Sequence, residues 1–258
     1  MSLRDLLVHP LARGLDPDSP HATEVRRTIV AQKGFLRHLC AEWYQNIAEA
    51  IPSGEGTILE IGTGPGFLHE FIPGLVTSDI LPLRGVSLVF DAHAVPFRNG
   101  TLKAIVLIDV LHHLSDCAAF FREAARCVRA GGIVVMIEPW VTALSSLVLG
   151  KLHYEPFDPR AEDWKLPRGG PLSCANQALP WIIFERDRIL FESYFRSWKI
   201  RSVVLHSPFS YIVSGGLSMR SLAPGAAFPF VRALERLAAP WIGTIAMFAT
   251  IVLERTHE

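Results

Sequence analysis

The sequence predicts an α/β fold built on a doubly wound, mostly parallel sheet. Short apolar runs that end in an acidic residue alternate with helical segments between residues 57 and 137. The first run is followed by a glycine-rich turn at residues 62–66, and the run at 104–108 is apolar throughout. Strands buried on both faces of a parallel sheet have such uninterrupted apolar sequences. Right-handed crossovers then place helices on both faces of the sheet.

The segment before the sheet is expected to be an irregular arm followed by a helical cap. Prolines and glycines interrupt residues 1–22. From 22 to 51, apolar residues recur every three or four positions, as on one face of a helix. The Pro-Ser-Gly run at 52–54 ends this helical region.

The central elements follow in alternation. Strands are expected at 57–61, 75–79, 88–90, 104–108 and 133–137, with helices at 67–71 and 117–129. The second helix is expected to be capped by Gly131 and Gly132.

After Pro139 the alternation stops. Residues 140–177 are expected to be an irregular lid, followed by a helix at 179–195, a strand at 199–205 and a last, antiparallel strand at 244–253. We therefore expect a single domain over residues 1–258, with an N-terminal arm and cap (1–52), a cofactor-binding core (53–139), a lid and substrate region (140–198) and C-terminal strands (199–258).

Composition excludes several classes of protein. Lys+Arg and Asp+Glu are both 25, and this balance argues against nucleic acid as a partner. The four cysteines form no CxxC pair, so we expect reduced thiols in a cytoplasmic protein and no cysteine zinc site. The first residues lack the long apolar run of a signal peptide, so none is expected, and the apolar run at 240–253 is shorter than the roughly 20 residues that span a bilayer. Peripheral contact with a membrane stays open.

The glycine turn predicts a nucleotide-like ligand. Glycines let a ligand approach the backbone, and the turn directs free N–H groups toward it. Dinucleotide folds have the pattern GxGxxG, but Phe67 follows Gly66 where their third glycine would stand. Glu60 precedes Gly62 by two positions. This spacing favours an S-adenosylmethionine site, with a nucleotide-dependent oxidoreductase or neither class as alternatives.

Acidic residues end the next three strands. Asp79 is placed to accept from ribose hydroxyls, and Asp91, followed by Ala92, to accept from an exocyclic amine such as that of adenine. Asp109 ends the fourth strand. Ligands bind at the carboxyl ends of strands in open α/β sheets, so these acids are expected on one rim. The alternative for each one is a local role as a helix cap or strand end.

Three further runs carry a family resemblance. They are FDAHAVPF at residues 90–97, DVLHHL at 109–114 and EAARCVRAGG at 123–132. With the glycine turn, they resemble the class I S-adenosylmethionine-dependent methyltransferases of the type 11, ubiquinone-biosynthesis-like group, over residues 57–138. Two departures are the short helix after Gly66 and Ala130 in place of the proline of the usual PGG turn.

The resemblance implies a Rossmann-like sheet of seven strands with an antiparallel last strand. It implies that Gly62 and Gly64 line the methionine part of the cofactor, that Asp79 holds the ribose, and that Asp109 lies near the sulfonium. The full set of expected cofactor-binding residues is Glu60, Gly62, Thr63, Gly64, Gly66, Asp79, Ile80, Asp91, Ala92, Asp109 and Val110.

Catalysis needs little from the protein beyond in-line placement, because the sulfonium methyl is already activated. A protonated acceptor such as a hydroxyl also needs a base. His113, and after it His112, are the proposed bases because both follow the fourth strand. A purely structural role for the LHHL element is the alternative.

Substrate contacts are expected from His153, Tyr154, Glu155 and Trp181. His153 with Glu155 could form a base and its orienting partner, or a metal site with Asp158, but no metal is expected. The predicted function is methyl transfer from S-adenosyl-L-methionine to a small-molecule acceptor, apolar or lipid-linked, with O-methylation favoured and S-adenosyl-L-homocysteine as product. An NAD-type oxidoreductase and a non-catalytic scaffold are the alternatives. Oligomeric state is left open.

Overall fold

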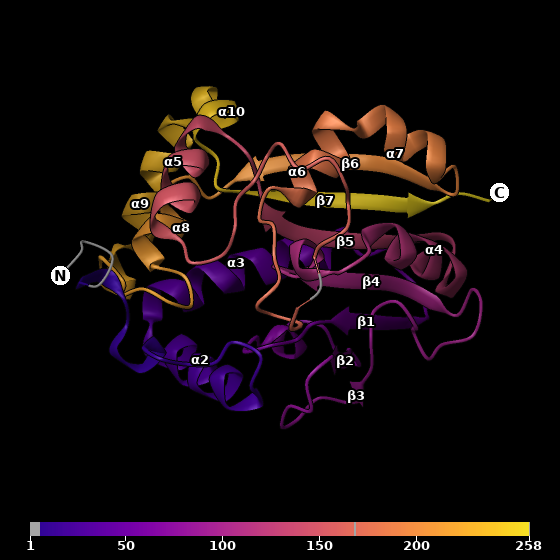
Figure 1. The fold of residues 1–258 in the computed structure, drawn as a ribbon, viewed down its shortest axis with the longest axis horizontal. Coiled ribbons are helices and arrows are strands. Elements are labelled where there is room, and N and C mark those ends of the chain that lie inside the picture. Colours follow the sequence, from indigo (N-terminus) through magenta and orange to yellow (C-terminus); the bar gives the residue numbers. More distant parts are fainter. Residues whose placement is uncertain (1–5, 168, 258) are drawn as a thin grey trace.

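A seven-stranded sheet forms the centre of the computed structural model, which describes residues 6–167 and 169–257 (Figure 1). The strands are β1 (Thr57–Ile61), β2 (Val76–Asp79), β3 (Leu88–Val89), β4 (Leu102–Ile108), β5 (Val128–Pro139), β6 (Trp198–His206) and β7 (Phe248–Arg255). Their order within the described residues is β3-β2-β1-β4-β5-β7-β6. β7 is antiparallel to both β5 and β6, and the pairs from β3 to β5 are parallel. The predicted fold class is therefore confirmed.

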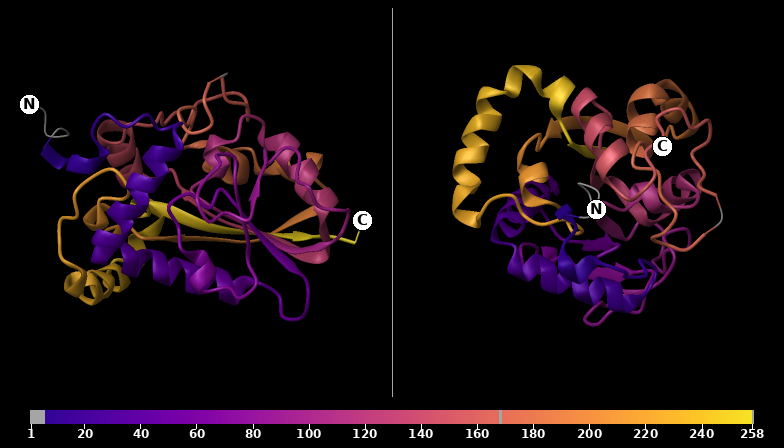
Figure 2. Two further views of the ribbon diagram at one scale, coloured as in Figure 1. Left: turned by 90° about the horizontal axis from the view of Figure 1, so that it is seen from below. Right: turned by 60° about the vertical axis from the view of Figure 1, so that its left-hand side comes forward.

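Helices cover both faces of the sheet (Figure 2). They are η1 (Pro10–Ala12), α2 (Pro20–Gln32), α3 (Gly34–Ala50), η2 (Leu68–Glu70), η3 (Leu111–His113), α4 (Cys117–Cys127), α5 (Ala143–Leu152), α6 (Leu179–Trp181), η4 (Ile182–Arg186), α7 (Arg188–Tyr194), α8 (Ser210–Ser214), η5 (Gly225–Ala227), α9 (Phe228–Leu237), η6 (Ala239–Trp241) and α10 (Ile242–Ile245). Two apolar cores result, one on each face. In β4, Ile105 and Leu107 join the core beneath α4 and α7, whereas Ala104 and Val106 join the core beneath α3.

The predicted helical cap is broken at Lys33. This residue leaves the helical region (φ −98°, ψ 86°) and separates α2 from α3. Its buried ammonium donates to the carbonyl oxygens of Gly216 and Met219, the latter at 2.9 Å. Burial lowers the pKa of Lys33 to about 8. The Lys33 side chain thus links the junction of α2 and α3 to residues 216–219, which are far away in the sequence.

The expected cap by Gly131 and Gly132 is wrong. α4 ends at Cys127, and both glycines lie inside β5. The register between β4 and β5 shifts here, because Leu102 pairs with Val128 and Ala104 with Ile133. Gly131 has φ +72°, which a glycine tolerates in such a bulge.

Helices were also missed in the second half of the chain. Residues 140–177 are not irregular throughout, because α5 follows Thr142, whose side chain forms a capping box with Ser145. The last strand begins at Phe248 and not at residue 244, because α10 occupies the start of the apolar run. Among the described residues, no helix has the length and apolar character that crossing a membrane requires.

Candidate active site

The turn after β1 requires its first glycine. Gly62 has φ +71°, and a Cβ there would lie 2.5 Å from Cγ2 of Val110. Gly64 also has positive φ, +51°, whereas a Cβ at Gly66 would lie 2.9 Å from the carbonyl oxygen of Thr63. At Gly62 the backbone of this turn therefore packs against the segment after β4 with no room for a side chain.

Asp79 holds the glycine turn in place. Its Oδ2 accepts from the amide of Gly64 and its Oδ1 from the amide of Leu81, both at 2.9 Å. Burial raises the pKa of Asp79 in spite of these bonds. Each carboxylate oxygen keeps a second lone pair, with which it could accept from a ligand hydroxyl.

Glu60 lies behind the turn and not in the cavity. Its side chain is buried, and Oε2 accepts from the hydroxyl of Thr63 at 2.9 Å. Burial raises the pKa of Glu60 to about 7. A Cβ at Gly66 would lie 3.1 Å from the hydroxyl of Tyr44, so this end of the turn has no room for a side chain. Glu60 thus supports the turn from behind.

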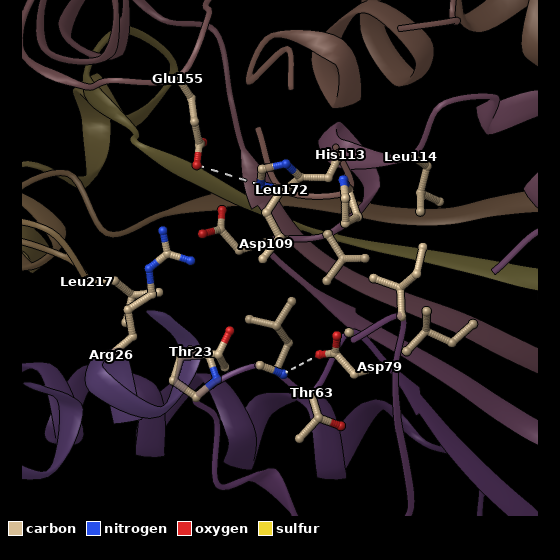
Figure 3. A pocket seen from close by; sticks show the side chains of 18 of the residues that line it. Thr23, Arg26, Thr63, Asp79, Asp109, His113, Leu114, Glu155, Leu172 and Leu217 are labelled. Carbon is tan, nitrogen blue, oxygen red and sulfur yellow. Dashed lines mark hydrogen bonds and ion pairs between the residues drawn. The ribbon is translucent and has the colours of Figure 1, made fainter. Parts of the chain in front are cut away.

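A cavity of about 660 Å³ opens at the carboxyl ends of the strands. The expected residues that line it are Gly62, Thr63, Gly64, Asp79, Ile80, Asp91, Ala92, Asp109, Val110, His113, His153, Tyr154 and Glu155. In the view of Figure 3, Asp109 lies between the glycine-turn side, marked by Thr63 and Asp79, and the side marked by His113 and Glu155. Four other expected residues, Glu60, Gly66, His112 and Trp181, do not line the cavity.

The backbone of Asp109 has a left-handed conformation, which is uncommon for residues other than glycine. It is one of two non-glycine residues with positive φ among those the structure describes, at +60°. Its amide donates to the carbonyl oxygen of Ile137 at 2.8 Å, which holds the chain in this conformation as it leaves β4. Loss of water around the carboxylate raises the pKa of Asp109 to about 7. Strained residues of this kind concentrate at functional sites.

His112 is fully buried beneath the cavity, which argues against its role as a base. Its Nδ1 lies 2.7 Å from Oε2 of Glu138, and Oε1 of Glu138 accepts from the amides of Val110 and Leu111. Sequence reasoning missed Glu138. The signal was present, because Glu138 stands near the carboxyl end of the fifth strand as the other acids stand at theirs.

His113 faces the cavity. Its Nδ1 lies 3.0 Å from the carbonyl oxygen of Cys174, and its Nε2 lies 3.7 Å from Oε1 of Glu155. Burial, with the nearby charge of His112, lowers the pKa of His113 to about 4. Burial alone would raise the pKa of Glu155, but the neighbouring histidines, His112 foremost, hold it well below its usual range.

The residues expected to contact substrate have three different surroundings. Gln177 donates to Oε2 of Glu155 at 2.7 Å and lies at the same distance from Nδ1 of His153, so these three side chains form one network. Tyr154 accepts from Arg26 at 3.3 Å. Trp181 does not line the cavity and packs against the core under α4, so the structure does not support its expected substrate contact.

Helices far apart in the sequence build the apolar wall of the cavity. Leu36 and Trp43 come from α3, Tyr211 comes from α8, and Leu217 and Phe248 complete the wall. The N-terminal helical cap expected from the sequence thus supplies part of this wall, whereas the sequence held no signal for Tyr211 or Leu217.

Comparisons with known proteins agree with this architecture. Residues 59–136 match the model of a family described as "Methyltransferase domain". Demethylmenaquinone methyltransferase of Roseiflexus castenholzii is 34% identical over 110 residues, which are 36% of this chain and 46% of the relative. The ubiquinone biosynthesis O-methyltransferase of Azorhizobium caulinodans is 24% identical over 65% of this chain and 75% of its own. The chain thus matches about half the length of the first relative.

A solved structure shares the whole fold. It is a methyltransferase in complex with the Haloferax volcanii Trm112 methyltransferase activator, with a TM-score of 0.56 and 13% identity over 94% of this chain and 98% of the other. The comparisons therefore agree with the predicted resemblance to the class I S-adenosylmethionine-dependent methyltransferases, because residues 59–136 match the methyltransferase domain family and both relatives are methyltransferases by name.

Proposed function

We propose that this protein transfers the methyl group of S-adenosyl-L-methionine to a hydroxyl of a small organic acceptor and releases S-adenosyl-L-homocysteine. One observation carries the proposal. A single cavity joins the glycine turn and the strand-end acids to the His113–Glu155 pair and to an apolar wall. Cofactor and acceptor would therefore meet in the same enclosed space, which is what in-line transfer requires.

The proposed cofactor lies along the strand ends. Asp79 would accept from the ribose hydroxyls, and Asp91 with Ala92 would contact the adenine. Asp109 would then lie beside the sulfonium, where a carboxylate attracts the positive charge. The S–CH₃ bond would break as the O–CH₃ bond forms, and the proton of the hydroxyl would leave to solvent.

The proposed acceptor is apolar and hydroxylated. Its body would pack on the wall that contains Trp43, Leu217 and Phe248, with Arg26 at the rim available for an anionic group. The two relatives, whose names place them in quinone biosynthesis, support an aromatic acceptor.

We further propose residues 1–52 as the cap and 140–198 as the lid, in a cytoplasmic protein. A lipid-linked acceptor would bring the protein to a membrane surface. Exposed Phe230, Leu237 and Trp241, on α9 and η6, would suit such contact.

Calorimetric titration with S-adenosyl-L-homocysteine tests the proposal. Asp79→Asn removes the charge and turns an N–H group toward a backbone amide, so affinity should fall roughly 10- to 100-fold, the loss expected for one or two charged hydrogen bonds. Asp116→Asn is the matched control, because Asp116 caps α4 from outside the cavity and asparagine caps nearly as well. Its affinity should stay unchanged.

An NAD-type oxidoreductase is the competing function, and NADH is the competing ligand. Saturable binding of NADH together with no binding of S-adenosyl-L-homocysteine would overturn the proposal. Equal affinity of Asp79→Asn and the unaltered protein for S-adenosyl-L-homocysteine would overturn the assigned role of Asp79 and favour a non-catalytic scaffold.

A further inference from the structure

In both His112 and His113, the ring nitrogen Nδ1 faces an oxygen that accepts a hydrogen bond. The Nδ1 of His113 lies 3.0 Å from a carbonyl oxygen, that of Cys174, which can only accept. The Nδ1 of His112 lies 2.7 Å from a carboxylate oxygen of Glu138. Each ring therefore donates from Nδ1, and in its neutral form each has a lone pair on Nε2. Metal-binding histidines are oriented in this way, by a carboxylate or carbonyl behind the ring.

Within the part of the chain that the structure describes, the Nε2 of His112 has no hydrogen-bond partner. The atom is buried, and its ring is fully excluded from solvent. Buried polar atoms without a partner are rare in native proteins and call for an explanation such as a bound ion. The Nε2 lies 3.5 Å from Oε2 of Glu155, which is too long for a charge-assisted hydrogen bond of about 2.7–2.9 Å.

Glu155 supplies a third donor at the same point. Its Oε1 lies 3.7 Å from Nε2 of His113, and the three donor atoms all lie within 4.8 Å of one another. Metal–ligand distances of about 2.0–2.2 Å put neighbouring donor atoms roughly 3.0–3.6 Å apart around one ion. The two distances from the histidines to the Glu155 carboxylate, 3.5 Å and 3.7 Å, are thus close to the donor spacing in a metal centre.

The surroundings favour a cation. Oδ1 of Asp109 lies 3.9 Å from Nε2 of His112, so a second carboxylate stands next to the three donors. Gln177 donates to Oε2 of Glu155 at 2.7 Å and fixes the direction of that carboxylate. The oxygens of Glu138 are already engaged by His112 and by the amides that follow Asp109, so Glu138 orients a ligand and is not one itself.

We propose that His112 Nε2, His113 Nε2 and a carboxylate oxygen of Glu155 bind one divalent transition-metal ion, such as Zn²⁺. Two imidazoles and one carboxylate form the ligand set of open metal sites, which keep a position for water or substrate. His113 and Glu155 line the cavity, so the open position faces the space assigned to the acceptor.

The consequence for the reaction rests on the proposed function. An acceptor hydroxyl at the open position would bind as the oxyanion, because a bound cation lowers the pKa of an oxygen ligand. Its proton would leave to solvent. The oxyanion would then attack the sulfonium methyl, with the O–CH₃ bond formed and the S–CH₃ bond broken.

Titration of the purified, chelator-treated protein with ZnCl₂, and with CoCl₂ as a visible probe, tests the site. We expect one equivalent of Zn²⁺ per chain, and a Co²⁺ absorption band that Zn²⁺ removes. Glu155→Gln and His113→Asn should each weaken binding by roughly 100-fold or more, and Glu138→Gln by about 10- to 100-fold, as for residues that orient a ligand. His69→Asn, which removes an exposed imidazole in η2 outside the cavity, should bind like the unaltered protein.

Two outcomes would overturn the site. One is the absence of saturable Zn²⁺ and Co²⁺ binding, in which case His112 is an imidazolium that pairs with Glu138 and Glu155. The other is equal Zn²⁺ affinity of Glu155→Gln and the unaltered protein, with circular dichroism showing both folded. Titration of the metal-free protein with S-adenosyl-L-homocysteine separates this failure from that of the proposed function, because cofactor binding without metal binding overturns the metal site alone.

Discussion

Gly62→Ala should destabilise the protein by more than the backbone cost of placing alanine at positive φ. Alanine at φ +71° costs about 1–2 kcal/mol in the left-handed region. The added methyl would also lie 2.5 Å from Cγ2 and 3.1 Å from Cγ1 of Val110, both on a β-branched side chain with little rotamer freedom. Such overpacking costs about 1–3 kcal/mol. The expected total is about 2–5 kcal/mol of unfolding free energy.

Two further variants separate these costs in urea unfolding. Gly74 has nearly the same φ, +74°, but no atom lies within 4 Å of a Cβ built there. Gly74→Ala should therefore cost only the backbone part, about 1–2 kcal/mol. In Gly62→Ala combined with Val110→Ala, the two colliding methyl groups are gone, so the double variant should be more stable than the sum of the two single effects predicts. Equal destabilisation by Gly62→Ala and Gly74→Ala would refute the reasoning.

Two other substitutions, at Glu60 and Arg126, test contacts that hold the loops of the site in place. The pKa of Glu60 is raised from 4.5 to about 7, so the stability that comes from its bound proton is complete below pH 4.5 and is lost as the pH rises through 7. Relative to Glu60→Gln, the unaltered protein should therefore lose about 3 kcal/mol between pH 4.5 and pH 8 in urea unfolding; a difference that does not change with pH would contradict this. Arg126 in α4 donates to the carbonyl oxygens of Val95 at 2.9 Å and Phe97 at 2.8 Å. Arg126→Met should cost about 1–3 kcal/mol and speed hydrogen exchange in residues 94–100, and unchanged exchange there would show that other contacts hold this loop.

The strand ends were predictable because they depend on short-range pattern. An apolar run with an acid at or next to its end, as at 57–61, 75–79 and 104–108, is typical of a buried parallel strand, and the topology alone then places these acids at one edge. The cavity accordingly contains Asp79, Asp91 and Asp109.

Contacts between distant residues were not predictable in the same way. No local pattern pairs His112 with Glu138 or Lys33 with the carbonyl oxygen of Gly216, because each pair is made by the tertiary fold. α5 was missed because serine, and not glutamate or glutamine, completes its capping box.

The position of Trp181 was misjudged for a related reason. A tryptophan in a lid segment has the composition of a substrate wall, but α6 turns this ring toward the core beneath α4. Composition indicates that the tryptophan ring will be buried. The packing of the helices then decides whether the ring contacts the apolar core or the cavity.

The place of β7 between β5 and β6 governs the order in which parts of the sheet can pair during synthesis. Translation produces α2 and α3 before their partners in α8 and around Gly216, and β7 follows these partners. Until β7 is made, β6 lacks the strand with which it pairs. Trp43 of α3, whose ring lies 4.9 Å from that of Phe248, likewise lacks this contact until β7 is made. Closure of such long loops makes folding slow and favours assistance by chaperones at this stage.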